Sequence, residues 1–312
     1  MLSRTASDLY WMSRYLERAE NLARMLDVSY SLSLMPHDGC GDGLDELALP
    51  LLITGTLDDY LTRHGQLHAE RMLHFFALDA ENPASLYCCL QAARANAHAV
   101  RGRITADMWE NINATWLEMR GIAAEGLGRY GISRFCEWVK ERSHLFRGAT
   151  FGTIMRGEAY RFIRLGTFIE RADNTARILD VKYHVLHHNG DEGATDFYQW
   201  GALLRSLSAF EVYRKVYRDL ITPARVAELL MLRLDMPRSL HACTRGIVRV
   251  LEAIKNDQSA ETERLAGILH AHIHYARIED ILKQGLHEYL TDFMDRIYEL
   301  GEGISKDFLV PA

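Results

Sequence analysis

A thirteen-residue segment occurs twice in the chain, as "LERAENLARMLDV" from Leu16 and as "IERADNTARILDV" from Ile169. Nine of the thirteen positions are identical, whereas about one match is expected by chance at ordinary residue usage. On a helical wheel, the apolar residues of the first copy fall on one side, and Glu17, Asn21 and Arg24 fall on the other. The segment therefore predicts two amphipathic helices, each with an apolar face that the fold must bury.

The similarity between the two halves extends beyond this segment. "LDAENPASLYCC" from Leu78 aligns with "LDMPRSLHAC" from Leu234 after a gap of two residues, and an acidic, turn-rich stretch follows each motif copy. The sequence predicts an internal duplication with repeats of about 1–155 and 156–312. Two copies are too few for a solenoid. We therefore expect one domain over 1–312, with two halves related by a pseudo-twofold axis.

The spacing of apolar residues predicts an all-α helical bundle. Segments of helical period dominate, and no alternating strand pattern with hairpin turns stands out. Among the expected elements are single helices over 45–63 and 195–219. Pro83, Pro223 and Pro237 each precede an apolar-periodic stretch, which predicts a helix that starts at the proline.

Charge and cysteine usage exclude several classes of protein. The net charge of −6 and the sequence pI of about 6.2 give no basic footprint for nucleic acid. The five cysteines are scattered and form no CxxC pair, which is typical of reduced thiols. The N-terminus lacks an apolar signal-peptide core, and the aliphatic runs are too short to span a bilayer. We expect a cytoplasmic protein with neither a membrane nor a nucleic-acid partner.

The polar side of the motif is repeated more faithfully than the apolar side. Leu22 corresponds to Thr175, whereas only one polar position differs, and it keeps its charge as Glu20 and Asp173. Exposed ion pairs along one helix contribute only about 0.2–0.5 kcal/mol, too little to preserve residue identity through a duplication. The candidate binding or buried polar cluster is therefore taken from both copies: Glu17, Arg18, Asn21, Arg24, Asp27, Glu170, Arg171, Asn174, Arg177, Asp180 and His184.

Two interpretations of this cluster stay open. In the structural one, the motif helices cross near the pseudo-axis, and Glu17 and Glu170 meet arginines of the opposite copy inside the protein. Removing one partner of such a buried pair costs about 3–5 kcal/mol. In the functional one, the stripes line a cleft whose arginines bind an anionic or zwitterionic ligand. An enzyme would then use Glu17 or Glu170 as its general base.

The sequence predicts neither a metal nor another cofactor. His270 and His274 have the spacing of a helical metal pair, but no HExxH pattern accompanies them and no third ligand is evident. The motif copies lack the Glu-x-x-His of di-iron bundles, and their arginines oppose a dication.

The two copies differ in the residues that come after the motif. After the second copy come Lys182, His184, His187 and His188, which have no counterparts of their kind after the first. We therefore expect ligand-linked or proton-linked behaviour mainly in the second half.

The duplicated Glu-Arg pair resembles the bacterial alpha-E domain family, an all-helical family named for that pair. Further stretches fit the resemblance over essentially the full length: "RITADMWENIN" (103–113), "FIRLGTFIERADNTARILDVKYH" (162–184), "YRKVY" (213–217), "LRLDMPRSLHAC" (232–243) and "GLHEYL" (285–290).

The resemblance implies a set of partners. Members of the family are neighbours of, or fused to, an ATP-grasp-type amide ligase, a transglutaminase-like protease and sometimes a proteasome-like hydrolase. The implied process is bacterial peptide synthesis or tagging. We expect a non-catalytic or substrate-presenting partner of the ligase, with a peptide or anionic ligand. The alternative is an enzyme that acts on a peptide or carboxylate substrate with the Glu-Arg stripes as its active site.

Overall fold

The computed structural model describes residues 1–34, 44–188 and 194–309, and its account of side chains further leaves out 44–46, 182–188 and 194–197. Over the described residues the chain forms sixteen α-helices and no strand, which confirms the predicted all-α fold. None of these helices is both long enough and apolar enough to cross a bilayer.

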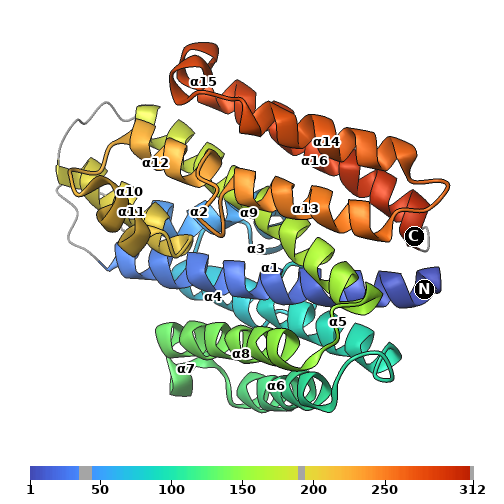
Figure 1. Ribbon diagram of the computed structural model, residues 1–312. Coiled ribbons are helices and arrows are strands. Elements are labelled where there is room, and N and C mark those ends of the chain that lie inside the picture. The colour runs from blue at the N-terminus through green and yellow to red at the C-terminus, as the bar shows by residue number, and fades with distance from the viewer. Residues whose placement is uncertain (35–43, 189–193, 310–312) are drawn as a thin grey trace. The chain divides into compact units, whose positions relative to one another are not determined.

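The helices fall into two sets of eight with similar lengths in the same order (Figure 1). The first set is α1 (Ser3–Ser33), α2 (Leu44–Thr54), α3 (Leu57–His64), α4 (Ala69–Ala77), α5 (Leu86–Ala99), α6 (Ala106–Glu125), α7 (Leu127–Tyr130) and α8 (Ile132–Thr153). The second set is α9 (Glu158–His188), α10 (Ala194–Ser206), α11 (Phe210–Tyr217), α12 (Pro223–Met231), α13 (Leu240–Ile254), α14 (Ala260–His274), α15 (Ile278–Gln284) and α16 (Leu286–Phe308). This parallel supports the duplication, which stays a prediction.

The chain divides into two compact units. The N-terminal unit is Trp11–Met155, and the C-terminal unit is Met1–Tyr10 together with Arg156–Ala312. The first motif copy therefore lies on the part of α1 in the N-terminal unit, and the second copy lies on α9 in the C-terminal unit. A single domain with pseudo-twofold symmetry stays a prediction.

In the C-terminal unit, α9 packs against α13 and α16, and α14 packs against the same two helices (Figure 1). The approach of α13 to α9 depends on Gly246. A Cβ atom at this position would lie 2.6 Å from the ring of Phe168, so any larger residue forces the ring to move. Apolar residues of α9 and α16, among them Leu165 and Phe293, are fully buried in this unit.

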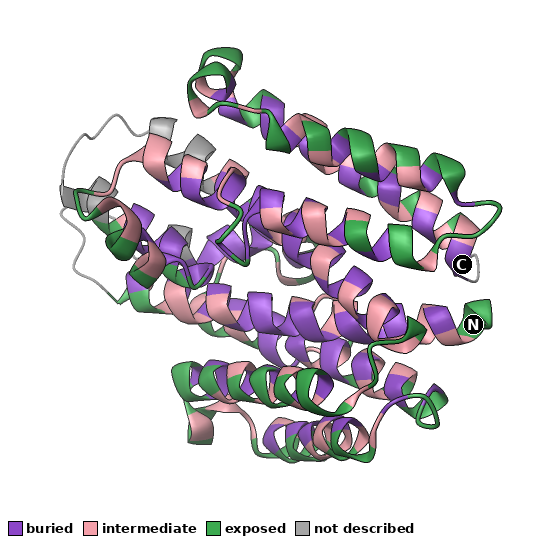
Figure 2. Ribbon diagram, in the orientation of Figure 1, coloured by how far each residue is buried: buried purple, intermediate pink, exposed green. Residues whose placement is uncertain are grey.

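In the N-terminal unit, α6 packs against α5 on one side and α8 on the other. Met108, Ile112 and Met119 of α6 are buried, as are Phe135 and Val139 of α8. The opposite side of α8 carries a stripe of exposed residues (Figure 2). This amphipathic pattern is the one expected for helices that cover a core on one side.

Two of the three predicted proline starts are wrong. Pro223 opens α12 as predicted, but α5 and α13 begin only after Ser85 and Ser239, beyond Pro83 and Pro237. Each serine caps its helix, because its Oγ accepts the backbone N–H three residues later, at 3.1 Å and 3.0 Å. Such a cap satisfies an N–H group that the first helical turn leaves without a partner. The prolines lie in the turns that lead to the caps.

Both serines also donate their hydroxyl hydrogen to the carbonyl oxygen six residues earlier, Ser85 to Asp79 at 2.7 Å and Ser239 to Arg233 at 2.5 Å. The two halves therefore build the same turn at equivalent places.

The long helices predicted over 45–63 and 195–219 are each broken. The break between α2 and α3 contains Gly55, whose φ of 67° lies in the left-handed region. Glycine adopts this conformation without steric cost. The break between α10 and α11 contains Ser208 with φ 55°, a conformation that its residue type does not signal.

Candidate functional site

In the N-terminal unit, the motif glutamates of α1 lie against α8. Glu20 is fully buried and Glu17 is 3% exposed. Arg147 of α8 contacts both: its Nη2 donates to Glu17 Oε2 at 3.3 Å and also to Glu20 Oε2. Ser143, one turn earlier on α8, donates its hydroxyl to the same Glu20 oxygen at 2.6 Å. The two carboxylates are thus neutralised and hydrogen-bonded inside the unit.

Arg24 completes the partners of Glu20. Its Nε and Nη2 lie 3.2 Å and 3.0 Å from Glu20 Oε1, and its side chain is 15% exposed. His144 of α8 lies 3.0 Å from Arg24 Nη2. Each oxygen of Glu20 therefore faces at least one guanidinium group, an arrangement that stabilises a buried carboxylate.

Asp27, one turn beyond Arg24, pairs with α8 as well. Lys140 Nζ lies 3.1 Å from Asp27 Oδ2 and 2.5 Å from Glu137 Oε2. Burial lowers the pKa of Lys140, but the hydrogen bonds to Glu137 and Asp27 outweigh it, so the pKa lies above its ordinary value. The hydrogen bond to Lys140 likewise lowers the pKa of Glu137. This ion pair stays charged at neutral pH.

The other two candidates in α1 are placed less centrally. The Arg18 guanidinium lies 5.6 Å from the centre of the Tyr15 ring, in a cation–π contact within the helix. Asn21 is 3% exposed. The structure thus brings Glu17, Arg24 and Asp27 to one face of α8.

The second motif copy, on α9, has different neighbours. Arg171 is 6% exposed, and its Nη1 donates to the backbone oxygen of Pro237 at 3.3 Å. The hydroxyl of Thr175 donates to the backbone oxygen of Arg238 at 2.9 Å. Both contacts fix the turn before α13 against α9. Glu170 is also buried, at 5% exposed.

Asn174 and Arg177 lie further along α9. The Nδ2 of Asn174 is buried and has no hydrogen-bond partner within the described part of the chain. Arg177 pairs with Asp173 at 2.9 Å, with the two side chains 46% and 24% exposed. This exposed pair is the intrahelical type that the sequence suggests for a solvated face.

Asp180 pairs with His287 at the start of α16, where Oδ1 and Nδ1 are 2.7 Å apart. This hydrogen bond, together with the charge of Asp180, raises the pKa of His287 above its ordinary value. The sequence pointed instead to His184 as the histidine beside Asp180. The side chain of His184 lies outside the described residues.

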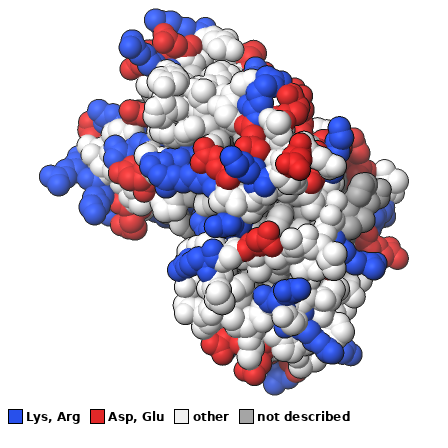
Figure 3. All heavy atoms as spheres, turned by 45° about the vertical axis from the view of Figure 1, so that its right-hand side comes forward, with Lys and Arg blue, Asp and Glu red and all other residues white. Residues whose placement is uncertain are grey.

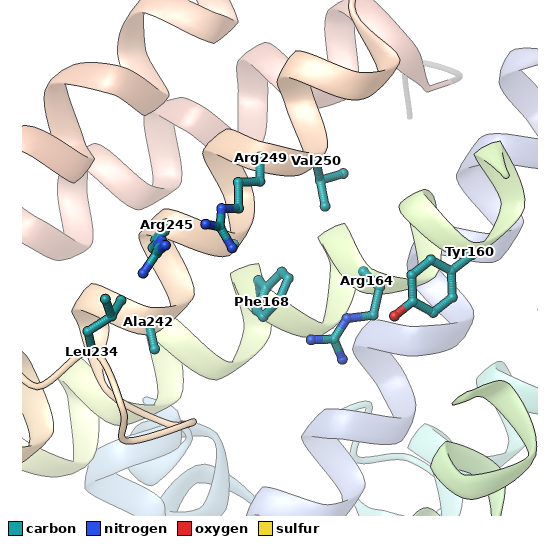
Figure 4. A pocket seen from close by; sticks show the side chains of 9 residues that line it. Tyr160, Arg164, Phe168, Leu234, Ala242, Arg245, Arg249 and Val250 are labelled. Carbon is teal, nitrogen blue, oxygen red and sulfur yellow. The ribbon is translucent and has the colours of Figure 1, made fainter. Parts of the chain in front are cut away.

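A groove between α9 and α13 is a ligand-sized concavity that the sequence did not predict. Its volume is about 520 Å³, which suits a small organic ligand or a short peptide end. Arg164 and Phe168 line it from α9, and Arg245 and Arg249 line it from α13 (Figure 4). We call it the arginine groove; Tyr160, Leu234, Ala242, Gly246 and Val250 complete its lining.

The cations of the arginine groove differ in their contacts. The Arg164 guanidinium lies 4.3 Å from the centre of the Phe168 ring. Arg245 is half-buried and Arg249 exposed, and neither has a hydrogen bond or ion pair to any described residue. Both guanidinium groups are therefore available to an anionic ligand. The spacing of Arg245 and Arg249, one helical turn apart, was visible in the sequence, but their partner helix was not.

The structure also brings a third histidine, which the sequence spacing did not make evident, to His270 and His274. His241 of α13 lies beside His270 and His274 of α14, with one ring nitrogen of each within 4.8 Å of the others. His241 is separated from His274 by 33 residues, so no local spacing marks the set. The pairing of α13 with α14 brings the three rings together.

On the face in Figure 3, basic and acidic side chains lie interspersed.

The helical fold and the two buried motif glutamates define the class of protein: an all-α protein in which Glu17 and Glu170 each lie inside a packed unit. A family model described as a predicted alpha-helical domain with a conserved ER motif matches residues 1–309. The chain belongs to this family, Alpha-E. The resemblance drawn from the Glu-Arg pairs is thereby confirmed at the level of the family.

Relatives of the chain include uncharacterized proteins of Mycobacterium bovis and Mycobacterium tuberculosis. Each is 22% identical over 322 residues, which covers 95% of this chain and 35% of the relative. The chain thus spans about a third of the length of these relatives. No solved structure shows a significant match to it.

Proposed function

We propose that the chain is a non-catalytic, substrate-presenting partner of an ATP-grasp-type amide ligase in a bacterial peptide synthesis or tagging system. The observation that best supports this proposal is the arginine groove. Arg245 and Arg249 offer two guanidinium groups without partners among the described residues, in a groove that Phe168 also lines. An amide ligase joins a carboxylate to an amine, so its substrate carries the anionic group that such a groove binds.

The groove suits an end of a peptide better than a free inorganic anion. Phe168, Leu234 and Val250 give it an apolar part beside its cations. A peptide end can place one carboxylate on the arginines and an aliphatic or aromatic side chain on that apolar part. Its volume of about 520 Å³ holds two or three residues rather than a folded domain.

The enzyme alternative has weaker support from the geometry. It needs Glu17 or Glu170 as a general base that reaches a substrate proton. Glu17 instead accepts a hydrogen bond from Arg147 and is almost completely buried. A buried carboxylate held by its cation is poorly placed to act as a general base.

Partnership with the ligase is tested by co-purification with an ATP-grasp protein encoded beside this chain. We expect a stable complex in which the chain increases ATP-dependent amide formation. The failure of every neighbouring ligase to bind the chain, or to respond to it, would count against the proposal.

Presentation by the groove is tested with a fluorescent glutamate-containing tripeptide that has a free terminal carboxylate, and with its amidated form. The wild-type chain should bind the first more tightly than the second. The double variant Arg245→Ala, Arg249→Ala should lose this preference and the stimulation of the ligase at unchanged melting temperature. Arg264→Ala is the matched control, because Arg264 is an exposed arginine of α14 that pairs with Glu261 away from the groove. Equal behaviour of the two variants would exclude the groove as the binding site.

A further inference from the structure

Three histidine rings converge between α13 and α14 in the C-terminal unit. His270 and His274 lie one turn apart on α14, and His241 is the second residue of α13. His274 Nδ1 lies 3.1 Å from His241 Nε2, and a nitrogen of His270 completes a set within 4.8 Å. Bonds of about 2.0–2.1 Å from zinc to nitrogen place tetrahedral ligand atoms about 3.3 Å apart. The nearest pair already has nearly that spacing.

The tautomer of His241 leaves one nitrogen ready to bind a metal. Its Nδ1 lies 2.9 Å from the backbone oxygen of Leu232. A carbonyl oxygen only accepts hydrogen bonds, so Nδ1 carries the hydrogen and Nε2 carries the lone pair. A ring N–H that donates to a backbone carbonyl is also the usual outer contact of a metal-bound histidine.

Thr244 holds His270 in the same tautomer as His241, with the hydrogen on Nδ1. Its hydroxyl lies 3.2 Å from the backbone oxygen of His241 and 3.3 Å from His270 Nδ1. The hydroxyl has one hydrogen, which the carbonyl takes, so the hydroxyl oxygen accepts from Nδ1–H of His270. The Nε2 of His270 then keeps its lone pair. Two of the three rings are therefore held in the tautomer that presents Nε2.

Packing alone does not require imidazoles here. The helices can be aligned between the two units by the residue before each one: Ser85 before α5 with Ser239 before α13, and Thr105 before α6 with Ser259 before α14. In this alignment Tyr87 corresponds to His241, and Trp116 corresponds to His270. The Tyr87 and Trp116 rings lie 5.0 Å apart, and the two histidine rings lie 5.4 Å apart. An ordinary aromatic pair fills this place in the N-terminal unit.

From these contacts we infer that His241, His270 and His274 form a binding site for a divalent transition-metal ion of the zinc class. Imidazole nitrogens suit Zn²⁺, and three histidine ligands leave a fourth position open. To coordinate through Nδ1, His274 shifts its ring hydrogen from Nδ1 to Nε2. The charge of Arg245 acts on His270 and opposes a cation there, which favours an anion as the fourth ligand.

The experiment uses the full chain without a polyhistidine tag, stripped with EDTA and titrated with Zn²⁺ in a calorimeter. We expect one saturable site per chain, a higher melting temperature with Zn²⁺, and intense visible absorption bands when Co²⁺ replaces it. The bands report a tetrahedral site independently of any variant. Absence of saturable Zn²⁺ binding and of the Co²⁺ bands would overturn the inference.

Variants locate the site. His274→Ala removes an exposed ligand and should abolish the Co²⁺ bands and the Zn²⁺-induced rise in melting temperature. Thr244→Val keeps the shape of a buried side chain and removes the contact to His270, which should weaken Zn²⁺ binding about 10–100-fold. His98→Ala, at an exposed histidine of the N-terminal unit, is the matched control and should bind as the wild type does. Zn²⁺ binding by His274→Ala at wild-type affinity would show that the ion binds elsewhere and would overturn the assignment.

Discussion

The contact between α5 and α6 includes the rings of Tyr87 and Trp116, whereas the corresponding contact between α13 and α14 holds three histidines. The motif helices differ in the same direction. On α1 the carboxylate of Glu20 is fully buried against Arg147, while its counterpart on α9, Asp173, is 24% exposed and pairs with an exposed arginine. The two similar segments thus bury the acidic side chain at this position in the N-terminal unit and leave it partly exposed in the C-terminal unit.

This difference bears on the expectation that ligand-linked behaviour belongs mainly to the second half. The expectation came from histidines and a lysine that follow the second motif copy, whose side chains lie outside the described residues. The described groups that suit ligands are others, namely the arginine groove and the three histidines of α13 and α14. They support the same division of roles through different residues.

The largest effect should follow the loss of Arg147. Arg147→Ala leaves Glu17 and Glu20 buried without the guanidinium that both contact. We expect the free energy of unfolding to fall by about 3–5 kcal/mol, because two buried carboxylates lose the guanidinium that they share. Urea denaturation measures the change.

The control for this prediction is Arg142→Ala, also on α8. Arg142 pairs with Glu118 at 2.8 Å, but the two side chains are 26% and 43% exposed. We expect a loss below about 1 kcal/mol, as for other exposed pairs. Similar losses for the two variants would show that the buried network contributes no more than a surface ion pair.

The next effect compares equivalent arginines in the two motif copies. Arg24→Ala removes two hydrogen bonds to the buried Glu20, so we expect a loss of about 1.5–3 kcal/mol. Arg177→Ala removes an exposed pair with Asp173, so we expect about 0–1 kcal/mol. Melting temperatures of the two variants provide the measurement. Equal losses would mean that the two copies play the same structural role.

A smaller effect should be the same in both units. Ser85→Ala and Ser239→Ala each remove a helix cap and the hydroxyl contact to a carbonyl six residues earlier. Loss of a cap costs about 0.5–2 kcal/mol, and the two variants should agree within experimental error in denaturant titrations. Clearly unequal losses would weaken the case that the halves descend from one repeat.

The sequence predicted the helical class and both motif helices because their apolar period is long and regular. It did not predict the partners of the motif. Arg147 lies 130 residues from Glu17, and nothing in the local spacing connects them. The structural interpretation expected arginines from the opposite copy, but the cation that the structure places on Glu17 within the N-terminal unit comes from α8.

Some helix boundaries and the ligand sites also could not be predicted from local sequence pattern. The break at Ser208 depends on a left-handed backbone conformation, which the presence of a serine does not predict. Gly246 lets α13 approach Phe168 closely beside the arginine groove, which no periodicity reveals. His241 joins His270 and His274 only through the pairing of two helices. Such sites depend on tertiary packing, and helical period alone does not specify it.

The smallest predicted effect compares the last acidic residue of each motif copy across pH. Asp27 pairs with Lys140, and Asp180 pairs with His287. The pKa of His287 is raised by its hydrogen bond to Asp180 and by the charges of Asp180 and Glu288. A histidine with a raised pKa in the folded state stabilises the fold fully below its unfolded pKa of about 6.5 and loses this contribution as pH rises through the folded value.

His287→Gln should therefore destabilise the protein more at pH 5.5 than at pH 8.5. The side chain of His287 is 52% exposed, so the difference should stay below about 1 kcal/mol. Lys140→Gln is the matched control. The pKa of Lys140 is raised from an ordinary value of 10.5, so Lys140 keeps its charge at both pH values and the cost of losing it should be constant. Urea denaturation of both variants and the wild type at the two pH values measures this. A pH-independent cost for His287→Gln, or a pH-dependent one for Lys140→Gln over this range, would remove the proton-linked contrast between the two motif copies.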